Sequence, residues 1–348
     1  MTTLRVGIAG YGVVGKRRKE VVDRRTDMTC VAVCDRSFSD EGTLPDGVRY
    51  YRTYQRLLEA ESLDTLIVCL TNDIAAEVTC AALELGLHVF CEKPPGRDLK
   101  DIQQVVETAR RHDGQVMKYG FNHRYHDSVR EALAMRDSAT LGRVLNMRGI
   151  YGKSQFISFG AHSDWRTQRA IAGGGILLDQ GIHLVDLMRL FGGEFNEVKS
   201  FISNDFWGHD VEDNAYALMR SRTGVIAMLH STATQWRHRF HLEITLERGA
   251  LILSGILSGS KSYGAETLKI VWAGDDDQGD PKEQTIRYNH DPSWEEEIAE
   301  FAEACLTGSP VRAGSPTDAL ETMRLVYRIY CADPEWKTRW NLDDELSA

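Results

Sequence analysis

The segment GYGVVG at residues 10–15 restricts the possible folds of this chain more than any other segment. It lies directly between an apolar, strand-like run and a helix-like run, which is the setting of a dinucleotide-binding turn. Gly10 would make the turn, Gly12 would let the backbone approach a pyrophosphate, and Gly15 would pack helix against strand. A plain glycine turn without a nucleotide is the alternative.

Strand-like and helix-like segments alternate through the first 120 residues. The strand-like segments are residues 4–10, 29–35, 63–71, 88–92 and 115–120, and the helix-like segments between them are residues 16–25, 51–61, 74–86 and 99–112. Strands that alternate with helices of about 10 to 15 residues form βαβ units and a parallel sheet. The first part of the chain is therefore predicted to be a doubly wound α/β domain.

The residues after the second strand bear on the choice of cofactor. Asp35 ends this strand, where a carboxylate can accept both ribose hydroxyls of NAD and repels the 2′-phosphate of NADP. Arg36 and Ser37 follow and would suit NADP. A further alternative is that the Asp35 carboxylate only caps a turn. NAD is therefore the predicted cofactor, with NADP as the alternative. Val13 and Val14, which lie within the glycine motif, are expected at the phosphates of the cofactor.

Glu92, Lys93 and two prolines end the strand at residues 88–92. Ligands of open α/β sheets bind beyond the carboxyl ends of the strands, so Lys93 is expected to face the nicotinamide. The alternative is a solvated lysine in a surface turn.

Length and composition limit the remaining possibilities. A chain of 348 residues suggests two domains, and 42% hydrophobic with 26% charged residues is typical of a globular protein. The formal net charge of -10 argues against nucleic acid or an anionic membrane as the main partner. No stretch approaches about 18 apolar residues and no targeting segment opens the chain, so we expect a cytoplasmic protein that binds a small molecule. The seven cysteines form no CxxC pair and predict neither a disulfide framework nor a zinc knuckle.

Strand signals dominate the chain after residue 122. The expected elements are a helix at residues 127–137, a segment at 142–152, strands at 197–206, 214–221, 225–234 and 239–247, loops at 252–264 and 273–284, and helices at 291–308 and 315–331. Runs of strands separated by short turns predict an antiparallel sheet. One face of this sheet is expected to meet a partner subunit.

Ionisable residues interrupt an apolar segment at residues 173–191, which three glycines open. Asp179, His183 and Asp186 share one helical face because they are spaced i, i+4 and i+7. A buried carboxylate or imidazole must find a partner or serve chemistry. Three interpretations remain open: a satisfied core pair, part of a metal site, or a metal-free acid/base pair with Asp186 behind the imidazole. Metal is the weakest, because a catalytic zinc needs three protein ligands and no third one stands at a recognisable spacing. The glycines would let the backbone approach a cofactor or substrate closely.

Together these motifs resemble the glucose-fructose oxidoreductase and inositol dehydrogenase family (Gfo/Idh/MocA). G-x-G-x-x-G is followed by E-K-P at residues 92–94 and by G-G-G-x-x-x-D-x-G-x-H-x-x-D at residues 173–186. The resemblance implies an N-terminal Rossmann domain at residues 1–122 with a doubly wound parallel sheet. It also implies a substrate-binding α+β domain at residues 123–348, built on a large open, mainly antiparallel sheet. That sheet commonly forms the oligomer interface, so a homodimer or homotetramer is expected.

The resemblance also implies roles for single residues. Lys93 would contact the substrate and the nicotinamide ribose, and Glu92 would touch the cofactor ribose. Asp179 and His183 would face the reacting carbon. The further residues implied are Trp165 and Arg166 near the nicotinamide, Arg124 at the substrate, and Thr71 and Asn72 at the cofactor. The last two depart from the family pattern, because the chain reads TNDIAA where the family often has T-P-N-x-x-H.

The predicted function is that of an NAD(P)-dependent oxidoreductase. It would transfer a hydride between the nicotinamide and a secondary alcohol or ketone of a sugar, nucleotide sugar or cyclitol. The polar segment GFNHRYH at residues 120–126, with Asn122 and Arg124, suits such a polyhydroxylated ligand. Either His183 or Lys93 would exchange the hydroxyl proton. Two alternatives remain: a glycosidase in which bound NAD transiently oxidises the sugar so that the aglycone leaves, and a non-catalytic, cofactor-binding sensor.

Overall fold

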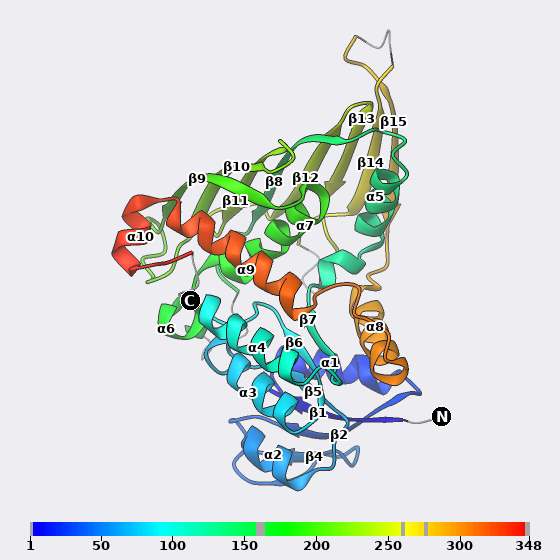
Figure 1. Cartoon of the computed structure of the whole chain (residues 1–348), viewed down its shortest axis with the longest axis vertical. Coiled ribbons are helices and arrows are strands. Elements are labelled where there is room, and N and C mark those ends of the chain that lie inside the picture. The colour runs from blue at the N-terminus through cyan, green and yellow to red at the C-terminus, as the bar shows by residue number, and fades with distance from the viewer. Residues whose placement is uncertain (1–2, 158–163, 259–261, 275–277, 345–348) are drawn as a thin grey trace. The chain divides into compact units, whose positions relative to one another are not determined.

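The computed structural model describes residues 3–157, 164–258, 262–274 and 278–344 and divides into two compact units (Figure 1). The N-terminal unit consists of Met1–Phe121, Ala170–Gly173 and Trp294–Met323. The C-terminal unit consists of Asn122–Arg169, Gly174–Ser293 and Arg324–Ala348. The chain leaves the first unit beside the boundary expected at residue 122. It then returns twice to that unit, which a division into two consecutive segments did not anticipate.

The N-terminal unit is built on a seven-stranded sheet with the order β3-β4-β2-β1-β5-β6-β7. The strands are β1 (Leu4–Ala9), β2 (Met28–Cys34), β3 (Gly42–Thr43), β4 (Arg49–Tyr51), β5 (Thr65–Val68), β6 (His88–Glu92) and β7 (Met117–Gly120). All neighbouring strands are parallel except β3 and β4. The strand order reverses between β1 and β5, which is the topology of a doubly wound sheet. The predicted Rossmann architecture is therefore confirmed.

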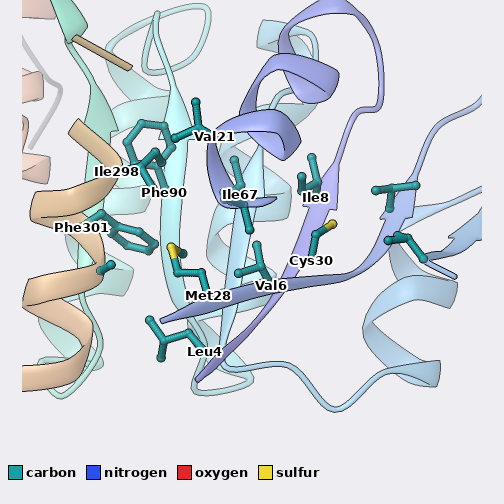
Figure 2. Packing of buried hydrophobic residues seen from close by; sticks show 14 residues of the cluster. Leu4, Val6, Ile8, Val21, Met28, Cys30, Ile67, Phe90, Ile298 and Phe301 are labelled. Carbon is teal, nitrogen blue, oxygen red and sulfur yellow. The ribbon is translucent and has the colours of Figure 1, made fainter. Parts of the chain in front are cut away.

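Helices connect these strands. They are α1 (Val13–Asp23), α2 (Tyr54–Ala60), α3 (Asn72–Glu84) and α4 (Leu99–Arg111). Asp98 caps α4, because its carboxylate accepts the N–H groups of Lys100 and Asp101. The core of the sheet gathers apolar side chains from β1, β2, β5 and β6, and Ile298 and Phe301 of α8 (Ser293–Thr307) pack against them (Figure 2). This apolar contact explains why residues 294–323 belong to the N-terminal unit.

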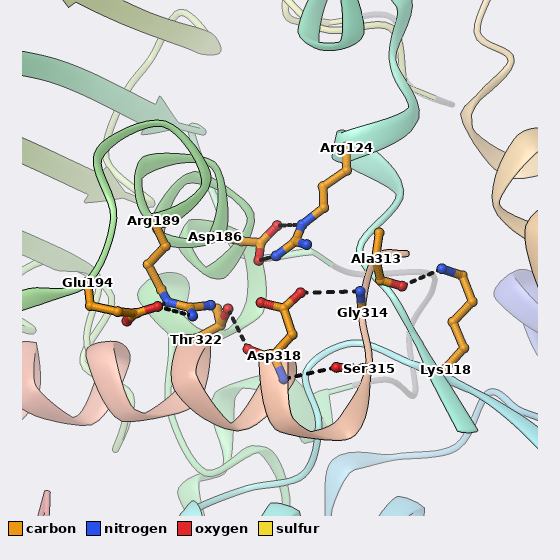
Figure 3. Close-up of polar contacts among 10 residues, drawn as sticks. All are labelled: Lys118, Arg124, Asp186, Arg189, Glu194, Ala313, Gly314, Ser315, Asp318 and Thr322. Carbon is orange, nitrogen blue, oxygen red and sulfur yellow. Dashed lines mark hydrogen bonds and ion pairs between the residues drawn. The ribbon is translucent and has the colours of Figure 1, made fainter. Parts of the chain in front are cut away.

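A buried lysine also binds the segment at residues 294–323. The side chain of Lys118 on β7 is fully buried and donates hydrogen bonds to the Glu300 carboxylate (3.2 Å) and to the carbonyl of Ala313 (2.5 Å; Figure 3). A charged group this far from water is stable only with such partners. The first part of α9 (Pro316–Cys331) follows directly.

The C-terminal unit contains an eight-stranded sheet with the order β15-β14-β13-β12-β8-β11-β10-β9. Its strands are β8 (Val144–Gly152), β9 (Phe195–Ser203), β10 (Asn214–Ser221), β11 (Ile226–Thr232), β12 (Arg239–Leu246), β13 (Gly249–Ser254), β14 (Glu266–Trp272) and β15 (Lys282–Tyr288). Every neighbouring pair is antiparallel except β8 and β11. The large, mainly antiparallel sheet is thus confirmed.

This unit also contains the helical segments η1 (Asn122–Tyr125), α5 (Asp127–Asp137), η2 (Asp164–Thr167), η3 (Leu177–Gly181), α7 (Ile182–Gly192) and α10 (Pro334–Trp340). The short helix α6 (Arg169–Ala172) belongs mostly to the N-terminal unit. Helix α7 packs closely on β8, where a Cβ added at Gly149 would lie 2.8 Å from Met188 and 2.9 Å from Leu184. None of the described helices combines the length and the apolar character needed to cross a membrane.

The two expected loops are partly wrong. Strand β13 continues to Ser254, inside the loop expected at residues 252–264, and β15 begins at Lys282, inside the loop expected at 273–284. Residues 259–261 and 275–277 of these loops lie outside the described residues. Glycine and serine lowered the strand signal here, but pairing with neighbouring strands overrides such local preferences.

Candidate active site

The three glycines of the first turn have different surroundings. Gly10 has a φ of +92°, and an added Cβ would lie 2.3 Å from the Cys69 carbonyl oxygen. A Cβ at Gly15 would lie 1.9 Å from the Gly10 oxygen, whereas a Cβ at Gly12 would meet no described atom within 4 Å. Two glycines therefore allow close packing, and the third leaves open space at the start of α1. This cradle fits the pyrophosphate of a dinucleotide.

Asp35 joins this turn to the end of β2. Its carboxylate accepts the backbone N–H of Tyr11 at 2.9 Å and that of Ser37 at 2.9 Å. Asp35 therefore caps its own turn and also lies beside the glycine loop, where a cofactor ribose is expected. Arg36 is exposed, and Val13 at the start of α1 is 45% exposed.

Glu92, at the end of β6, is held by an arginine from α1. Arg18 is completely buried, and its guanidinium donates to Glu92 (2.6 Å) and to Glu297 (2.7 Å). Burial raises the pKa of Glu297 to about 7, while the Arg18 charge opposes this shift. Lys93 follows as a half-buried residue, so it is not the fully solvated lysine of the alternative interpretation. Sequence reasoning missed Arg18, because KRRKE reads as a solvent-exposed run.

Thr71 and Asn72 make local contacts at the start of α3. The Thr71 hydroxyl donates to Asp73 at 2.6 Å, and the Asn72 amide donates to the Ala172 carbonyl at 2.8 Å. Asn72 thereby attaches residues 170–173 to the N-terminal unit. The cofactor contacts expected of these two residues stay predictions.

Asp179 and His183 lie in consecutive turns of the C-terminal unit. Both are buried, with 8% and 5% of their surfaces exposed. Asp179 lies in η3, a single π-helical turn that the sequence did not predict and that precedes the regular helix α7. Such turns are frequent at functional sites. Arg166 places its Nε 3.5 Å from an Asp179 oxygen and its guanidinium 4.2 Å from the centre of the Trp165 ring. The structure therefore brings Trp165, Arg166 and Asp179 together.

Asp186, on the next turn of α7, is bound by Arg124. The guanidinium donates two hydrogen bonds to the carboxylate, at 2.7 and 2.5 Å (Figure 3). Paired bonds of this kind fix both groups firmly. Arg124 thus connects η1 to α7, in addition to the substrate role expected from the sequence.

A buried glutamate binds the backbone near the start of the glycine-rich segment at residues 173–191. Glu212 accepts the N–H groups of Gly175 (2.7 Å) and Leu177 (2.9 Å) and the hydroxyl of Tyr330 (2.7 Å). Burial raises the pKa of this carboxyl. A Cβ at Gly174 would lie 2.3 Å from the Tyr330 oxygen, and one at Gly175 would lie 2.1 Å from the Glu212 carbonyl oxygen. These two glycines therefore allow Tyr330 and Glu212 to approach the backbone closely. Nothing in the sequence pointed to Glu212.

Further polar residues gather near Asp179. Tyr263 donates to the Gln180 amide oxygen at 2.9 Å. Burial, with a contribution from the Asp179 carboxylate, raises the pKa of Tyr151 and of Tyr263 above the ordinary range. Asn122, expected at the substrate, donates to Ser293 at 3.0 Å. Sequence reasoning missed both tyrosines, because they come from separate segments without a motif.

The described residues contain no group of three or more histidine, cysteine, aspartate or glutamate side chains arranged to hold a metal ion.

Comparison with known proteins assigns both parts of the chain. Residues 4–119 match the family model described as "Oxidoreductase family, NAD-binding Rossmann fold", and residues 129–252 match that of the "GFO/IDH/MocA C-terminal domain". D-glucoside 3-dehydrogenase of Escherichia coli is 32% identical over 214 residues, 58% of each chain. 1,5-Anhydro-D-fructose reductase of Ensifer adhaerens is 31% identical over 62% of this chain and 64% of its own. The chain thus matches less than two thirds of the length of these relatives.

A solved structure of levoglucosan dehydrogenase with NADH and L-sorbose has a TM-score of 0.83, at 19% identity over 97% of this chain and 98% of its own. At that identity the likeness shows the fold alone. Two family models nevertheless cover the two units in turn, and both carry the same family name. The N-terminal unit is therefore an NAD-binding Rossmann domain, and the chain belongs to the Gfo/Idh/MocA family of oxidoreductases.

Proposed function

We propose that the protein is an NAD-dependent dehydrogenase or reductase acting on a secondary alcohol or ketone of a sugar or cyclitol. The observation that carries this proposal is the buried pair Asp179 and His183, with Arg166 beside the carboxylate. Similar proteins that are named as a D-glucoside dehydrogenase, an anhydrofructose reductase and an inositol dehydrogenase support the substrate class. A non-catalytic sensor would have no need for such proton-transfer groups.

The nicotinamide would supply the hydride chemistry when it is bound. His183 would accept the hydroxyl proton during oxidation and return it during reduction, since an imidazole exchanges protons near neutral pH. Lys93, which follows the end of β6, is the second candidate for this proton exchange. Asp179, held by Arg166, would accept a hydrogen bond from a neighbouring hydroxyl and so orient the sugar.

A substrate screen tests this proposal. Sugars, cyclitols and nucleotide sugars would be incubated with NAD or NADP while the absorbance of reduced nicotinamide and the products are followed. We expect net reduction of NAD with at least one sugar or cyclitol. Glycoside cleavage without net NADH would instead indicate a redox-cycling glycosidase, and tight cofactor binding without any product would indicate a sensor.

Asp35 is expected to make NADH bind more tightly than NADPH. Replacing Asp35 with serine should raise the affinity for NADPH relative to NADH by about tenfold or more, because a repulsive carboxylate is removed. Titration of nicotinamide fluorescence would give both dissociation constants. Asp40→Ser, which removes an exposed carboxylate of the same unit, is the control. Tighter binding of NADPH by the unaltered protein would contradict the assignment.

We further propose that the protein assembles through the outer face of the C-terminal sheet. Strand β10 alternates between buried and exposed residues, and its exposed Tyr216 and Leu218 lie beside Phe201 of β9 and Met228 of β11. Between 49% and 81% of the surface of these four residues is exposed. A contiguous apolar patch of this kind is typical of a protein interface.

Leu218→Glu should therefore convert the assembly to a monomer. The new carboxylate would be buried against an apolar partner surface, which is strongly unfavourable. Light scattering during gel filtration would measure the mass. Leu85 is similarly exposed, at 61% against 56% for Leu218, but lies in the N-terminal unit, so Leu85→Glu should leave the mass unchanged. A protein that is already monomeric, or an unchanged mass in Leu218→Glu, would refute the proposed interface.

A further inference from the structure

Two histidine rings lie face to face in the C-terminal unit. The ring of His123, in η1, has its centre 3.7 Å from that of His183, and the two planes differ by 9°. Both residues are buried, with 6% and 5% of their surfaces exposed. We propose that His123 is a positioning residue, which holds the imidazole of His183 in the orientation needed for proton transfer. This inference rests on the proposed function of His183.

The ring of His123 is fixed through both of its nitrogens. Its Nδ1 lies 3.2 Å from the Asn122 amide oxygen, and its Nε2 lies 3.2 Å from the Tyr151 hydroxyl. The Asn122 amide nitrogen donates to Ser293, so the amide oxygen is left to accept a hydrogen from His123. The Tyr151 hydroxyl can then donate to Nε2. Both hydrogen bonds match a neutral imidazole that carries its hydrogen on Nδ1.

Two aromatic rings also pack edge-on against the His123 ring. The ring of His126 meets His123 edge to face, with centres 5.4 Å apart and planes at 72°, and Phe240 does the same at 5.9 Å and 72°. Because the ring is held by hydrogen bonds at both nitrogens and by packing at its sides, it cannot turn without losing these contacts. The flat surface that it presents to His183 is therefore rigid.

Charged and titratable groups surround the stacked pair. They are Tyr151 on β8, Asp179 on η3 with Arg166 beside it, His126 next to α5, Glu266 on β14 and Asp291 before α8. The His126 ring lies 2.9 Å from Glu266 and 3.8 Å from Asp291. Burial opposes the ionisation of Glu266, but the hydrogen bond and charge of His126 hold the pKa of this carboxyl below its usual range. The two carboxylates therefore lie beside the His126 ring, whereas the His123 nitrogens contact the uncharged Asn122 and Tyr151 side chains, which suit a neutral ring.

A neutral ring suits the chemistry of His183. When His183 accepts the substrate proton, its positive charge develops over the electron-rich face of His123, which is a favourable arrangement. A second positive charge on His123 would repel it at this distance. The stack also stops the His183 ring from turning, so the same nitrogen stays directed at the hydroxyl. Small errors in such positioning are costly, since a displacement of about 1 Å can lower a rate by about 100-fold.

The stacking can be measured without any substrate. In protein labelled with isotopes in histidine, the His183 ring protons should resonate upfield, because they lie over the His123 ring. His123→Ala should move them downfield, and His123→Phe, which keeps a flat aromatic ring, should preserve the upfield position. Phe240→Leu is the control for lost packing, since Phe240 contacts His123 edge-on. This variant should also keep the His183 signals at their upfield position. Unmoved His183 signals in His123→Ala would overturn the proposal.

Kinetics then test the role of the stack. His123→Ala should lower kcat by about tenfold or more, alter its pH dependence and leave the KM for NAD within about twofold, while His123→Phe should recover kcat to within about threefold of the original. Melting temperatures would show that both variants are folded. Equal kcat values in His123→Ala and the unaltered enzyme, or equal losses in the Ala and Phe variants, would overturn the inference. Absence of turnover in the unaltered protein would instead refute the proposed function.

Discussion

His183→Ala is expected to lower turnover by roughly 10²- to 10⁴-fold, which is the usual contribution of a general acid or base. The imidazole is buried at the start of α7, with 5% of the residue's surface exposed. The pH dependence of kcat near neutrality should change with it, because imidazoles exchange protons in that range. Steady-state kinetics from about pH 5 to 9 would measure both effects.

Two further variants make this test specific. His290→Ala removes an exposed histidine of the same unit and should leave turnover unchanged. Asp179→Asn should impair turnover or substrate binding without unfolding the protein, because the amide can still hydrogen-bond. A fully active His183→Ala enzyme would return Asp179 and His183 to the role of a structural core pair. Stoichiometric zinc together with inactivation by a chelator would point to the metal interpretation instead.

Lys93→Met is the second change with a large expected effect. Lys93 follows the last residue of β6 and is half-buried, and Glu92 beside it is held by the buried Arg18. Methionine keeps most of the length of the unbranched side chain but removes the charge and the hydrogen-bond donors. Turnover should therefore fall by roughly 10²- to 10⁴-fold, while the dissociation constant of NADH stays within about threefold. An interaction made in the transition state lowers kcat more than it weakens binding of the ground state.

Single-turnover kinetics and NADH titration would separate these two quantities. Lys100→Met, at an exposed position of α4, is the matched control and should behave as the unaltered enzyme. Near-normal activity of Lys93→Met would assign the lysine to a surface turn. Equal losses of NADH affinity and turnover would make it a cofactor anchor without a part in the chemistry.

Much of the fold could be predicted because its signals are local. The helix expected at residues 127–137 has the same bounds as α5, Asp127–Asp137, and all nine elements expected in the first 120 residues are present. The glycine motif also located its turn, where the structure has Gly10 at positive φ and Gly12 facing open space. Turn chemistry and hydrophobic periodicity depend on neighbouring residues, so they can be read without the tertiary structure.

The sequence was less informative where elements depend on distant partners. The sequence predicted loops over parts of β13 and β15 and no strand at β14. These strands form because they pair with their neighbours across the sheet. The π-helical turn at Asp179 was also unexpected, because the spacing of apolar residues there fits an ordinary helix.

The sequence by itself indicated that Asp179, His183 and Asp186 are buried on one helical segment, while the tertiary structure decided their partners and added buried charges that no motif marks, such as Arg18 and Glu212. Arg18 reaches Glu297 across 279 residues of chain, and Arg124 reaches Asp186 across 62. His183 stacks on His123 in the same way, although no motif links the two. A buried charge must find a partner, but the side chain that provides it is set by packing between distant segments. Local sequence patterns therefore do not reveal which side chain is the partner.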